Sequence, residues 1–412
     1  YYEVFCYFPS FSESPYLLCT IYRKLIKLLK IMKKHKICII GDGLSGLITA
    51  QILSTLDIEI DLISKKSQKK NIDNRTTAIS PSNYKFISKY LLKKRANLFF
   101  ECKKINLYQE KENDNLFNFM NFENSGKNLM LIVENKNLRK ILISDIKKNK
   151  KIKILREDIK EIDIGKTSIS FKKKKHYYDM ILLCVGKNYR MVEKLIGKRF
   201  IEEDKKEIAF TCTVKHNLNF TESKQYFLRE GPMAMLPINN KKFSLIWSMN
   251  NNYRSYNDNQ IKNLILLKLG NIFSKKTKLN LSKIDCFPIY FKFNRNFFKN
   301  NIFAIGESAY NVYPIAGQGF NLVLRDIEKL HKKIKASISL GIQIKDSLIF
   351  NDLYLDRKPE NFLYGLGIDL TQKFFRYNKL TEPIKNNLLK DIGKFPFLKK
   401  IGLKITDKGI IN

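Results

Sequence analysis

A glycine-rich turn between an apolar run and a helix limits the possible folds of this chain more than any other feature. The apolar run covers residues 37–40, and Gly41-Asp42-Gly43-Leu44-Ser45-Gly46 follows it directly. In such a turn Gly41 permits the tight bend, Gly43 lets a pyrophosphate approach the backbone, and Gly46 lets the helix pack closely on the strand. The motif therefore predicts a dinucleotide-binding site.

The helix after this turn would begin with Leu44 and Ser45, whose free backbone N–H groups and favourable helix dipole suit a phosphate. Apolar residues continue at helical spacing over residues 47–56, and residues 58–63 are typical of a second buried strand. A strand–helix–strand unit of about thirty residues is the expected size for a parallel crossover. The N-terminal part is therefore predicted to be a Rossmann-like α/β unit.

Ser64 stands where the fingerprint of this fold requires an acid. In that fingerprint a carboxylate after the second strand, about 20 residues beyond the glycines, holds the ribose hydroxyls. A serine hydroxyl can also hydrogen-bond a ribose, but more weakly than a carboxylate does. We therefore expect Ser64 to contact the cofactor and to bind it less tightly than an acid would.

A second motif follows a buried run at residues 301–305 and opens another helix. It comprises Gly306-Glu307-Ser308-Ala309-Tyr310 and then Pro314-Ile315-Ala316-Gly317-Gln318-Gly319-Phe320-Asn321-Leu322. An acid at a strand end can bind a sugar hydroxyl. Backbone N–H groups at residues 317–319 could face an electron-rich ring edge, where the helix dipole stabilises negative charge on a reduced flavin. A simple NAD-dependent dehydrogenase would not need this second motif, so the two motifs together favour FAD.

Five ordered segments resemble the FAD-dependent aromatic-ring hydroxylases of the para-hydroxybenzoate hydroxylase type. The resemblance is closer to the ubiquinone-biosynthesis hydroxylases, which act on polyprenyl-phenol rings. The segments are the two glycine motifs, Arg75-Thr76-Thr77-Ala78-Ile79-Ser80, Val133-Glu134-Asn135 with Leu138 and Leu142, and Gly231-Pro232-Met233-Ala234-Met235-Leu236-Pro237. The resemblance runs from about Lys33 to the C-terminal helices, which is nearly the whole chain.

The resemblance implies a Rossmann-like FAD-binding domain interleaved with a mixed or antiparallel-sheet substrate domain and followed by a helical C-terminus. Alternation of polar and apolar residues over 195–300 independently favours an antiparallel sheet. FAD-binding segments are expected at residues 32–110, 136–194 and 299–345, substrate-domain segments at 111–135 and 195–298, and C-terminal helices at 346–412. The cofactor-binding residues it implies are Gly41, Gly43, Leu44, Ser45, Gly46, Ser64, Arg75, Gly306, Glu307, Pro314, Gly317, Gln318, Gly319 and Asn321.

The activity implied by the resemblance is that of an FAD-dependent monooxygenase. Such an enzyme hydroxylates the ring of a polyprenylated phenol through a flavin C4a-hydroperoxide, with O2 as co-substrate and NAD(P)H or another reductant as electron donor. That scheme demands no catalytic side chain, and we name none. A flavin halogenase is set aside, because its W-x-W-x-I-P segment has no counterpart in a chain with one tryptophan, Trp247.

The chain departs from the family pattern at four flavin-facing positions. Glu307 stands for an Asp, Tyr310 for a His, and Val185 for the Asp of an A-D-G segment, in addition to Ser64. The glycine scaffold is intact at both motifs, so we expect an active enzyme. The alternatives are a catalytically impaired, non-enzymatic subunit with a flavoprotein fold in a membrane-associated biosynthetic complex, or another FAD oxidoreductase.

The net charge of +37 comes from 76 Lys and Arg against 39 Asp and Glu, and it would suit an anionic partner. The basic residues are spread along the chain without a zinc-finger, RNP or basic-zipper pattern, so we do not expect nucleic-acid binding. Seven scattered cysteines, never in C-x-x-C spacing, argue against disulfides and zinc and favour a reducing cytosol. The four histidines are expected at the surface, and no metal site is expected.

Membrane contact is expected from the substrate rather than from a spanning helix. No apolar run is long enough to cross a bilayer, yet a prenylated phenol would lie in one. We therefore expect a cytoplasmic protein, peripheral at the inner face of the membrane, beside other ubiquinone-biosynthesis enzymes. Residues 395–401 place aromatic side chains next to lysines, which suits an interface as well as it suits packing on the sheet domain. Residues 1–31 precede Met32 and are expected to be a non-native leader.

Overall fold

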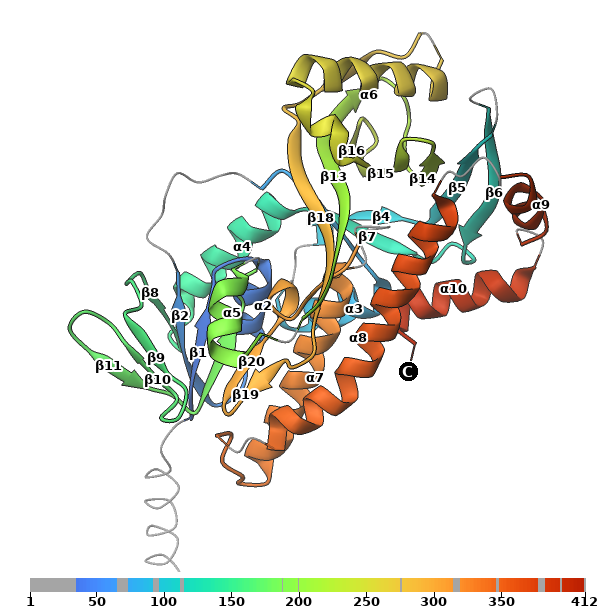
Figure 1. Cartoon of the computed structure of the whole chain (residues 1–412). Helices are drawn as coiled ribbons and strands as arrows, with labels where there is room; N and C mark the ends of the chain where they lie inside the picture. The colour runs from blue at the N-terminus through green and yellow to red at the C-terminus, as the bar shows by residue number, and fades with distance from the viewer. Residues whose placement is uncertain are drawn as a thin grey trace, which may run out of the picture.

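The computed structural model describes residues 35–64, 73–91, 96–111, 115–186, 188–198, 200–274, 276–313, 319–345, 348–376, 382–392 and 395–410. The leader expected at residues 1–31 lies outside these ranges, as do Pro314, Gly317 and Gln318 of the second motif. Two large sheets, joined by a smaller one and flanked by helices, make up the described part of the chain (Figure 1).

The first large sheet is the Rossmann-like one that the sequence predicts. Its strands are, in spatial order, β19 (Phe298–Lys299), β20 (Ile302–Ala304), β12 (Met180–Leu183), β1 (His35–Ile40), β2 (Ile58–Ile63) and β8 (Ile152–Leu155). The neighbouring strands are parallel except for β19 and β20. Strand β12 and most of β1 are buried apolar runs, as expected where helices cover both faces of a parallel sheet.

Six of the described helices contribute buried side chains to the hydrophobic core of this sheet. They are α2 (Leu44–Leu53), α3 (Pro81–Tyr90), α4 (Asn135–Lys148), α5 (Tyr189–Ile196), α7 (Gly319–Ser339) and α8 (Leu348–Phe375). The crossover from β1 through α2 to β2 is the strand–helix–strand unit expected from the apolar spacing. A small antiparallel ribbon of β9 (Glu161–Asp163), β10 (Ser168–Ser170) and β11 (Lys175–Tyr177) precedes β12.

The second large sheet is mixed and has nine strands in the described part of the chain. Their order is β21 (Tyr310–Asn311), β18 (Asp285–Asn294), β13 (Phe200–His216), β16 (Lys242–Asn250), β15 (Gly231–Asn239), β14 (Ser223–Leu228), β5 (Lys104–Glu110) and β6 (Leu116–Glu123), and β17 (Leu279–Leu281) pairs with β13. Of the strand pairs described in this second sheet, only β14–β5 is parallel. Helix α6 (Asp258–Ile272) covers one face of this sheet, where Trp247 and Ile265 are fully buried (Figure 1).

A three-stranded sheet connects the two large ones. It consists of β3 (Thr76–Ile79), β7 (Met130–Glu134) and β4 (Phe100–Cys102), and α3 (Pro81–Tyr90) and the short helix η1 (Ala96–Leu98) follow β3. Because side chains alternate along a strand, Ala78 and Ile132 pack on Leu236 of β15 while Ile79 and Val133 join the core of the Rossmann-like sheet. The small sheet therefore fixes the two large sheets to each other.

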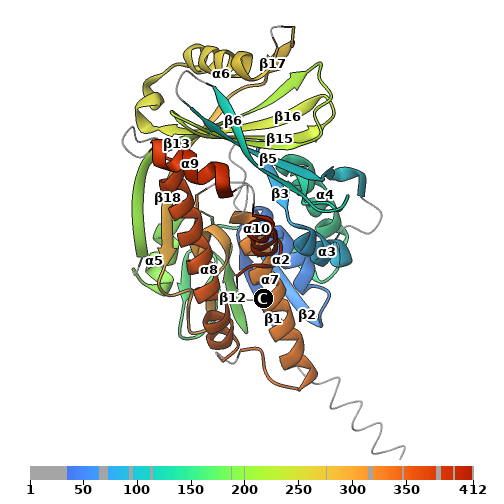
Figure 2. The same ribbon diagram turned by 90° about the vertical axis from the view of Figure 1, so that its right-hand side faces the viewer.

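The chain ends in helices α8 (Leu348–Phe375), α9 (Glu382–Ile392) and α10 (Pro396–Lys408). Helix α8 has 28 residues, which at 1.5 Å per residue makes it about 42 Å long. Near its start Phe350 stacks on Phe303 of β20, and at its end Phe375 stacks on Phe227 of β14. It thus runs along the molecule from one large sheet to the other (Figures 1 and 2). None of the described helices has the length and apolar character needed to cross a membrane.

The α/β fold with a mixed second sheet and a helical C-terminus is confirmed. Strand β5 pairs with β14 of the second sheet, although its residues fall within the FAD-binding segment expected at 32–110. The division into segments stays a prediction. The surface location expected for the histidines is wrong for His216 and His331, which are 7% and 4% exposed. Stacking on Phe243 buries the first ring, and packing on Tyr90 buries the second.

Candidate functional site

Two glycines of the first motif are in places that admit no side chain. Gly41 has a φ of +116°, and a Cβ there would lie 2.2 Å from the carbonyl oxygen of Cys184. A Cβ at Gly46 would lie 1.9 Å from the carbonyl oxygen of Gly41. The tight bend and the close contact of helix and strand therefore both depend on glycine, as the fingerprint requires.

Gly43, by contrast, borders open space, because an added Cβ would meet no atom within 4 Å. It is the N-cap of α2, and no side chain among the described residues caps this helix. The first backbone N–H groups of α2, at Leu44, Ser45 and Gly46, have no partner inside the helix. An uncapped helix N-terminus beside open space fits the pyrophosphate of a dinucleotide.

The second motif packs against the first. Gly306 follows β20 with a φ of +68°, and a Cβ there would lie 3.1 Å from Ser45 Oγ of α2 and 3.4 Å from the methyl groups of Val323 of α7. Gly306 therefore lies where α2 and α7 come together. The two glycine motifs, which are far apart in the sequence, therefore lie side by side at the carboxyl ends of the parallel strands.

A third segment, after β12, completes this edge of the sheet. The backbone N–H of Val185 donates to Ser308 Oγ at 2.9 Å, and a Cβ at Gly186 would lie 3.7 Å from Glu307 Oε2. The chain therefore gathers the ends of β1, β12 and β20 around Glu307. In open α/β sheets, ligands bind outside the carboxyl ends of the strands, which is where these segments lie.

Ser64, at the end of β2, belongs to a small hydrogen-bonded group with Asp42 and Arg139. Its hydroxyl donates to Asp42 Oδ2 at 3.0 Å, and Arg139 of α4 donates to the same oxygen at 2.7 Å. The Asp42 side chain is 37% exposed, and that of Arg139 36%. Sequence reasoning missed both residues, although Asp42 stands between the first two glycines of the motif. The sequence holds no comparable signal for Arg139, because only folding brings α4 to this position.

Arg75 lies between the second motif and the second sheet. Its Nε and Nη2 donate to the two carboxylate oxygens of Asp73 at 2.8 and 2.9 Å, and its guanidinium lies 5.2 Å from the ring centre of Phe287 on β18. Burial alone would lower the pKa of Arg75, but Asp73 and the charges of Glu307 and Asp285 raise it above its ordinary value. Arg75 therefore places a permanent positive charge between the second motif and the second sheet.

Asp73 is a third residue that the sequence reasoning missed. Besides Arg75 it accepts a hydrogen bond from Asn135 Nδ2 at 3.1 Å, and Thr77 Oγ1 donates to the amide oxygen of Asn135 at 2.6 Å. Its place two residues before Arg75 was the available signal, because short acidic side chains often bond neighbouring groups in turns. Asp73 therefore holds Arg75 in position through a network that reaches β3 and α4.

The side chain of Asn321, predicted to bind the cofactor, is engaged with the protein. Its amide oxygen accepts from the backbone N–H of Ser80 at 2.8 Å and from Asn83 Nδ2 at 3.0 Å, and its amide nitrogen donates to the carbonyl of Ala78 at 3.0 Å. It ties α7 to the junction of β3 and α3. Gly319, also predicted to bind the cofactor, is the first residue of α7.

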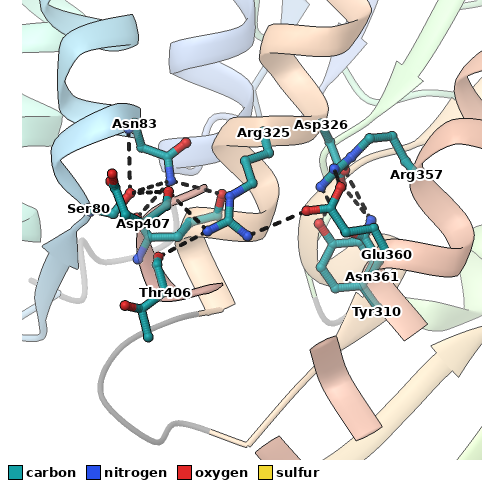
Figure 3. Close-up of polar contacts among 11 residues, drawn as sticks. Ser80, Asn83, Tyr310, Arg325, Asp326, Arg357, Glu360, Asn361, Thr406 and Asp407 are labelled. Carbon is teal, nitrogen blue, oxygen red and sulfur yellow. Dashed lines mark hydrogen bonds and ion pairs between the residues drawn. The ribbon is translucent and has the colours of Figure 1, made fainter. Parts of the chain in front are cut away.

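Tyr310, at the family's His position, points into a buried polar network behind the motif (Figure 3). Its hydroxyl donates to Asp326 of α7, which also accepts from Arg357 Nε of α8 at 2.6 Å. Burial, with the charge of Asp326 and the hydrogen bond to it, raises the pKa of Tyr310 well above its ordinary value. Arg325, which directly precedes Asp326 in α7, donates to the carbonyl of Thr406 on α10 at 3.0 Å. The second motif is therefore supported by all three of these helices.

The second sheet presents a face of small and aromatic residues toward the motifs. Ala209 and Thr211 on β13 pair with Phe287 and Asp285 on β18, and directly paired residues share a face. Phe287 carries Arg75 over its ring, so this face looks toward the glycine motifs. Thr211 is 4% exposed, and its hydroxyl has no hydrogen-bond partner among the described residues. The expected substrate-side strand at residues 231–237 is part of β15 in the same sheet.

A cavity of about 280 Å³ lies on the opposite face of this sheet. Ile208, Phe210, Cys286 and Pro288 of the sheet line it, with Ile261 of α6 and residues of the short helix η3 (Asn251–Ser255) and its surroundings. The strands separate this cavity from the glycine motifs, because its sheet residues alternate with those that face the motifs. It is therefore not part of the candidate site.

No family model matches the chain. The chain is 29% identical over 188 residues to the mitochondrial ubiquinone biosynthesis monooxygenase of Dictyostelium discoideum, covering 38% of either protein. It is 26% identical over 160 residues to 3-demethoxyubiquinol 3-hydroxylase of Escherichia coli (strain K12), covering 37% of this chain and 40% of that protein. Each match thus spans about two fifths of the relative's own length.

Solved structures resemble the chain over most of its length. The p-nitrophenol 4-monooxygenase of Pseudomonas putida DLL-E4 has a TM-score of 0.74 at 13% identity and covers 90% of this chain and 99% of that one. HpxO of Klebsiella pneumoniae, solved with FAD and uric acid, has a TM-score of 0.71 at 11% identity over 92% and 98%. Identities this low show the fold alone. The chain is therefore similar in sequence to ubiquinone-biosynthesis enzymes over about two fifths of its length, and its fold is similar to that of the p-nitrophenol monooxygenase and of the FAD-binding HpxO.

Proposed function

We propose that the chain is an FAD-dependent monooxygenase that hydroxylates the aromatic ring of a polyprenylated phenol in ubiquinone biosynthesis. The sequence similarity to two ubiquinone-biosynthesis enzymes supports the substrate class. The observation that carries the flavin part is the contact of Gly306 with Ser45, which joins the two glycine motifs at one sheet edge. A dinucleotide with a ring system at its far end would touch both motifs.

The residues near this edge suit different parts of FAD. The uncapped N-terminus of α2 suits the pyrophosphate, and Glu307 suits a sugar or ribityl hydroxyl. The backbone N–H groups of Gly317, Gln318 and Gly319 are proposed to face the flavin ring, and Pro314 is proposed to contact the cofactor, as predicted from the second motif. When bound, FAD would supply the oxygen-activating redox chemistry, with O2 as co-substrate and NAD(P)H or another reductant as electron donor.

The phenol ring is proposed to lie against the inner face of the second sheet. Ala209 is small and leaves room there beside Phe287 of β18. Packing of the phenol ring against this face would orient it without a charged group. The protein's task is then to position the ring and to exclude water.

The test begins with the absorption spectrum of the purified chain. We expect the two visible bands of oxidised flavin and release of FAD on denaturation. With a reductant present, adding a prenylated phenol should accelerate oxygen uptake and yield a hydroxylated product by mass spectrometry. A yellow protein that hydroxylates no prenylated phenol would favour the non-enzymatic alternative or another FAD oxidoreductase. A chain that binds no flavin would remove the proposal.

Peripheral contact with the inner face of the cytoplasmic membrane is the second part of the proposal. Exposed apolar side chains gather on the C-terminal helices, among them Leu355 and Leu370 of α8 and Phe397 of α10, which is 71% exposed. Lys399 and Lys400 adjoin Phe397, and such a combination suits an anionic bilayer surface. Other ubiquinone-biosynthesis enzymes could share the same surface.

Vesicle sedimentation tests this contact. The chain should bind vesicles that contain phosphatidylglycerol more strongly than vesicles of phosphatidylcholine alone, and Phe397→Ser should weaken both interactions. Tyr256→Ser is a matched control, because Tyr256 is also an exposed aromatic residue, 45% accessible, but lies beside α6. Equal binding by the two variants would show that the C-terminal helices are not the contact.

A further inference from the structure

The end of β2 lacks the acid that holds a ribose in dinucleotide-binding folds. Ser64 occupies the position and is 8% exposed, so its hydroxyl has little direct access to a ligand. The backbone at this point is nevertheless that of the fingerprint, because the N–H of Gly41 donates to the carbonyl of Ile63 at 2.9 Å. The strand end and the glycine turn are thus adjacent, and a carboxylate could reach the same place from either.

Asp42 supplies a carboxylate at this place. Its Oδ2 receives the hydrogen bond of Ser64, at 3.0 Å, so the carboxylate stands directly beyond the end of β2. The side chain is 37% exposed, against the largely buried Ser64. The group that the sequence lacks at residue 64 is therefore provided by the residue between the first two glycines.

The carboxylate retains the capacity to bind a ligand. The two hydrogen bonds that described residues donate to the Asp42 side chain, from Ser64 and from Arg139, both end on Oδ2, and Oδ1 accepts none from a described residue. A carboxylate has about four acceptor sites, enough for these bonds and for the hydroxyls of a ribose. Its charge would by itself repel nearby phosphates, and the guanidinium of Arg139 at 2.7 Å offsets it.

We propose that Asp42 binds the adenosine ribose hydroxyls of the dinucleotide, with Ser64 and Arg139 holding its carboxylate in position. The inference rests on the proposed FAD binding, and it reassigns the role predicted for Ser64 from direct contact to positioning. Because Asp42 would supply the carboxylate, the serine at residue 64 no longer predicts weak cofactor binding.

The test compares FAD with two altered flavins in titrations of the full apo chain, followed by flavin fluorescence. FMN lacks the adenosine half, and an FAD analogue with 2′-deoxyadenosine lacks one ribose hydroxyl. Loss of a hydrogen bond to a charged group costs about 1.5–3 kcal/mol, so Asp42→Ala should weaken FAD binding about 10- to 100-fold. It should leave FMN binding unchanged, and it should abolish the preference of the wild type for FAD over the deoxy analogue.

Asp57→Ala is the matched control, because it removes an aspartate that is 70% exposed and stands before the start of β2, at the opposite end of that strand from Ser64. It should bind FAD like the wild type. Asp42→Asn keeps the shape of the side chain and should show the same loss of the FAD preference if Asp42→Ala proves unstable.

Three outcomes are distinguishable. If Asp42→Ala and Asp42→Asn bind FAD as tightly as the wild type, Asp42 does not hold the ribose, although the proposed function stands. Equal losses of FAD and FMN, or a preference for FAD over the deoxy analogue that survives in the variants, also overturn the inference, since Asp42 would then only support the fold. If the wild type binds no flavin, both proposals fall together.

Discussion

The two glycine motifs meet at one edge of the sheet, but different kinds of atoms confine them. At Gly41 and Gly46 an added Cβ would strike backbone atoms at 2.2 and 1.9 Å. At Gly306 the nearest atoms would be side-chain atoms of Ser45 and Val323, at 3.1 and 3.4 Å. Side chains can change rotamer, whereas the backbone of a packed strand cannot move without disturbing the sheet. The backbone of the first motif is therefore held rigidly by other backbone atoms, whereas the second motif is confined by side chains that can rearrange.

The largest effect is expected from Gly46→Ala. The new methyl group would overlap a carbonyl oxygen, so the free energy of unfolding should fall by at least about 3 kcal/mol, the upper part of the range for overpacking. Urea denaturation followed by circular dichroism measures this loss. Gly43→Ala is the control, because its Cβ would meet no atom within 4 Å and stability should stay unchanged. Equal stability of the two variants would refute the rigid first motif.

Tyr310→Phe tests the support behind the second motif. The change removes the hydroxyl that donates to the Asp326 carboxylate in a buried network, and loss of a hydrogen bond to a charged group costs about 1.5–3 kcal/mol. The urea midpoint should fall accordingly. Tyr177→Phe serves as the control, because Tyr177 is 59% exposed and its hydroxyl should contribute little. An unchanged midpoint in Tyr310→Phe would mean that the network does not stabilise the motif.

Gly306→Ala should cost less than Gly46→Ala. Its φ of +68° is left-handed, which costs a non-glycine residue about 1–2 kcal/mol, while the side-chain contacts can relax. A double-mutant cycle with Val323→Ala sharpens the comparison. Truncating Val323 should relieve part of the cost and give a coupling of at least about 0.5 kcal/mol. Strict additivity would show that Val323 does not confine the second motif.

The smallest effect concerns the pH dependence of the contact between α7 and the turn after α2. His331 Nε2 lies 3.3 Å from Thr55 Oγ1, and its ring packs on Tyr90. Burial lowers the pKa of His331, and the charges of Lys335 and Lys89 lower it further. In the unfolded chain the pKa is about 6.5, so the unfolded state binds more protons below that value. Stability is therefore complete above pH about 6.5 and is lost as the pH falls through the folded pKa.

His331→Gln should reduce this pH dependence. Melting temperatures between pH 8 and pH 5, roughly the range over which histidine titrates, should fall less steeply in the variant than in the wild type. Part of the slope should remain, because burial also lowers the pKa of His216 in the second sheet. Identical slopes would show that the protonation of His331 is not linked to folding.

Much of the backbone at the candidate site was predictable from local sequence. The apolar run at residues 37–40 and the glycines after it predicted β1, the turn and α2, because strand periodicity and glycine geometry act within a few residues. The second motif was likewise expected after a strand, and β20 (Ile302–Ala304) precedes it. The prediction failed where a side chain finds its partner far along the chain, as His331 does at Thr55, 276 residues away.

The sequence by itself determined the first strand–helix–strand unit, the two glycine motifs and the class of cofactor that they suit. Only the tertiary structure decided that the carboxylate of Asp42 accepts the hydrogen bond of Ser64, that the side chain of Asn321 joins α7 to β3, and that Tyr310 is tied to Asp326. The physical reason is the range of the interactions. Backbone conformation follows from neighbouring residues, whereas hydrogen-bond partners in a core are chosen when distant segments pack and every buried polar group must find a partner.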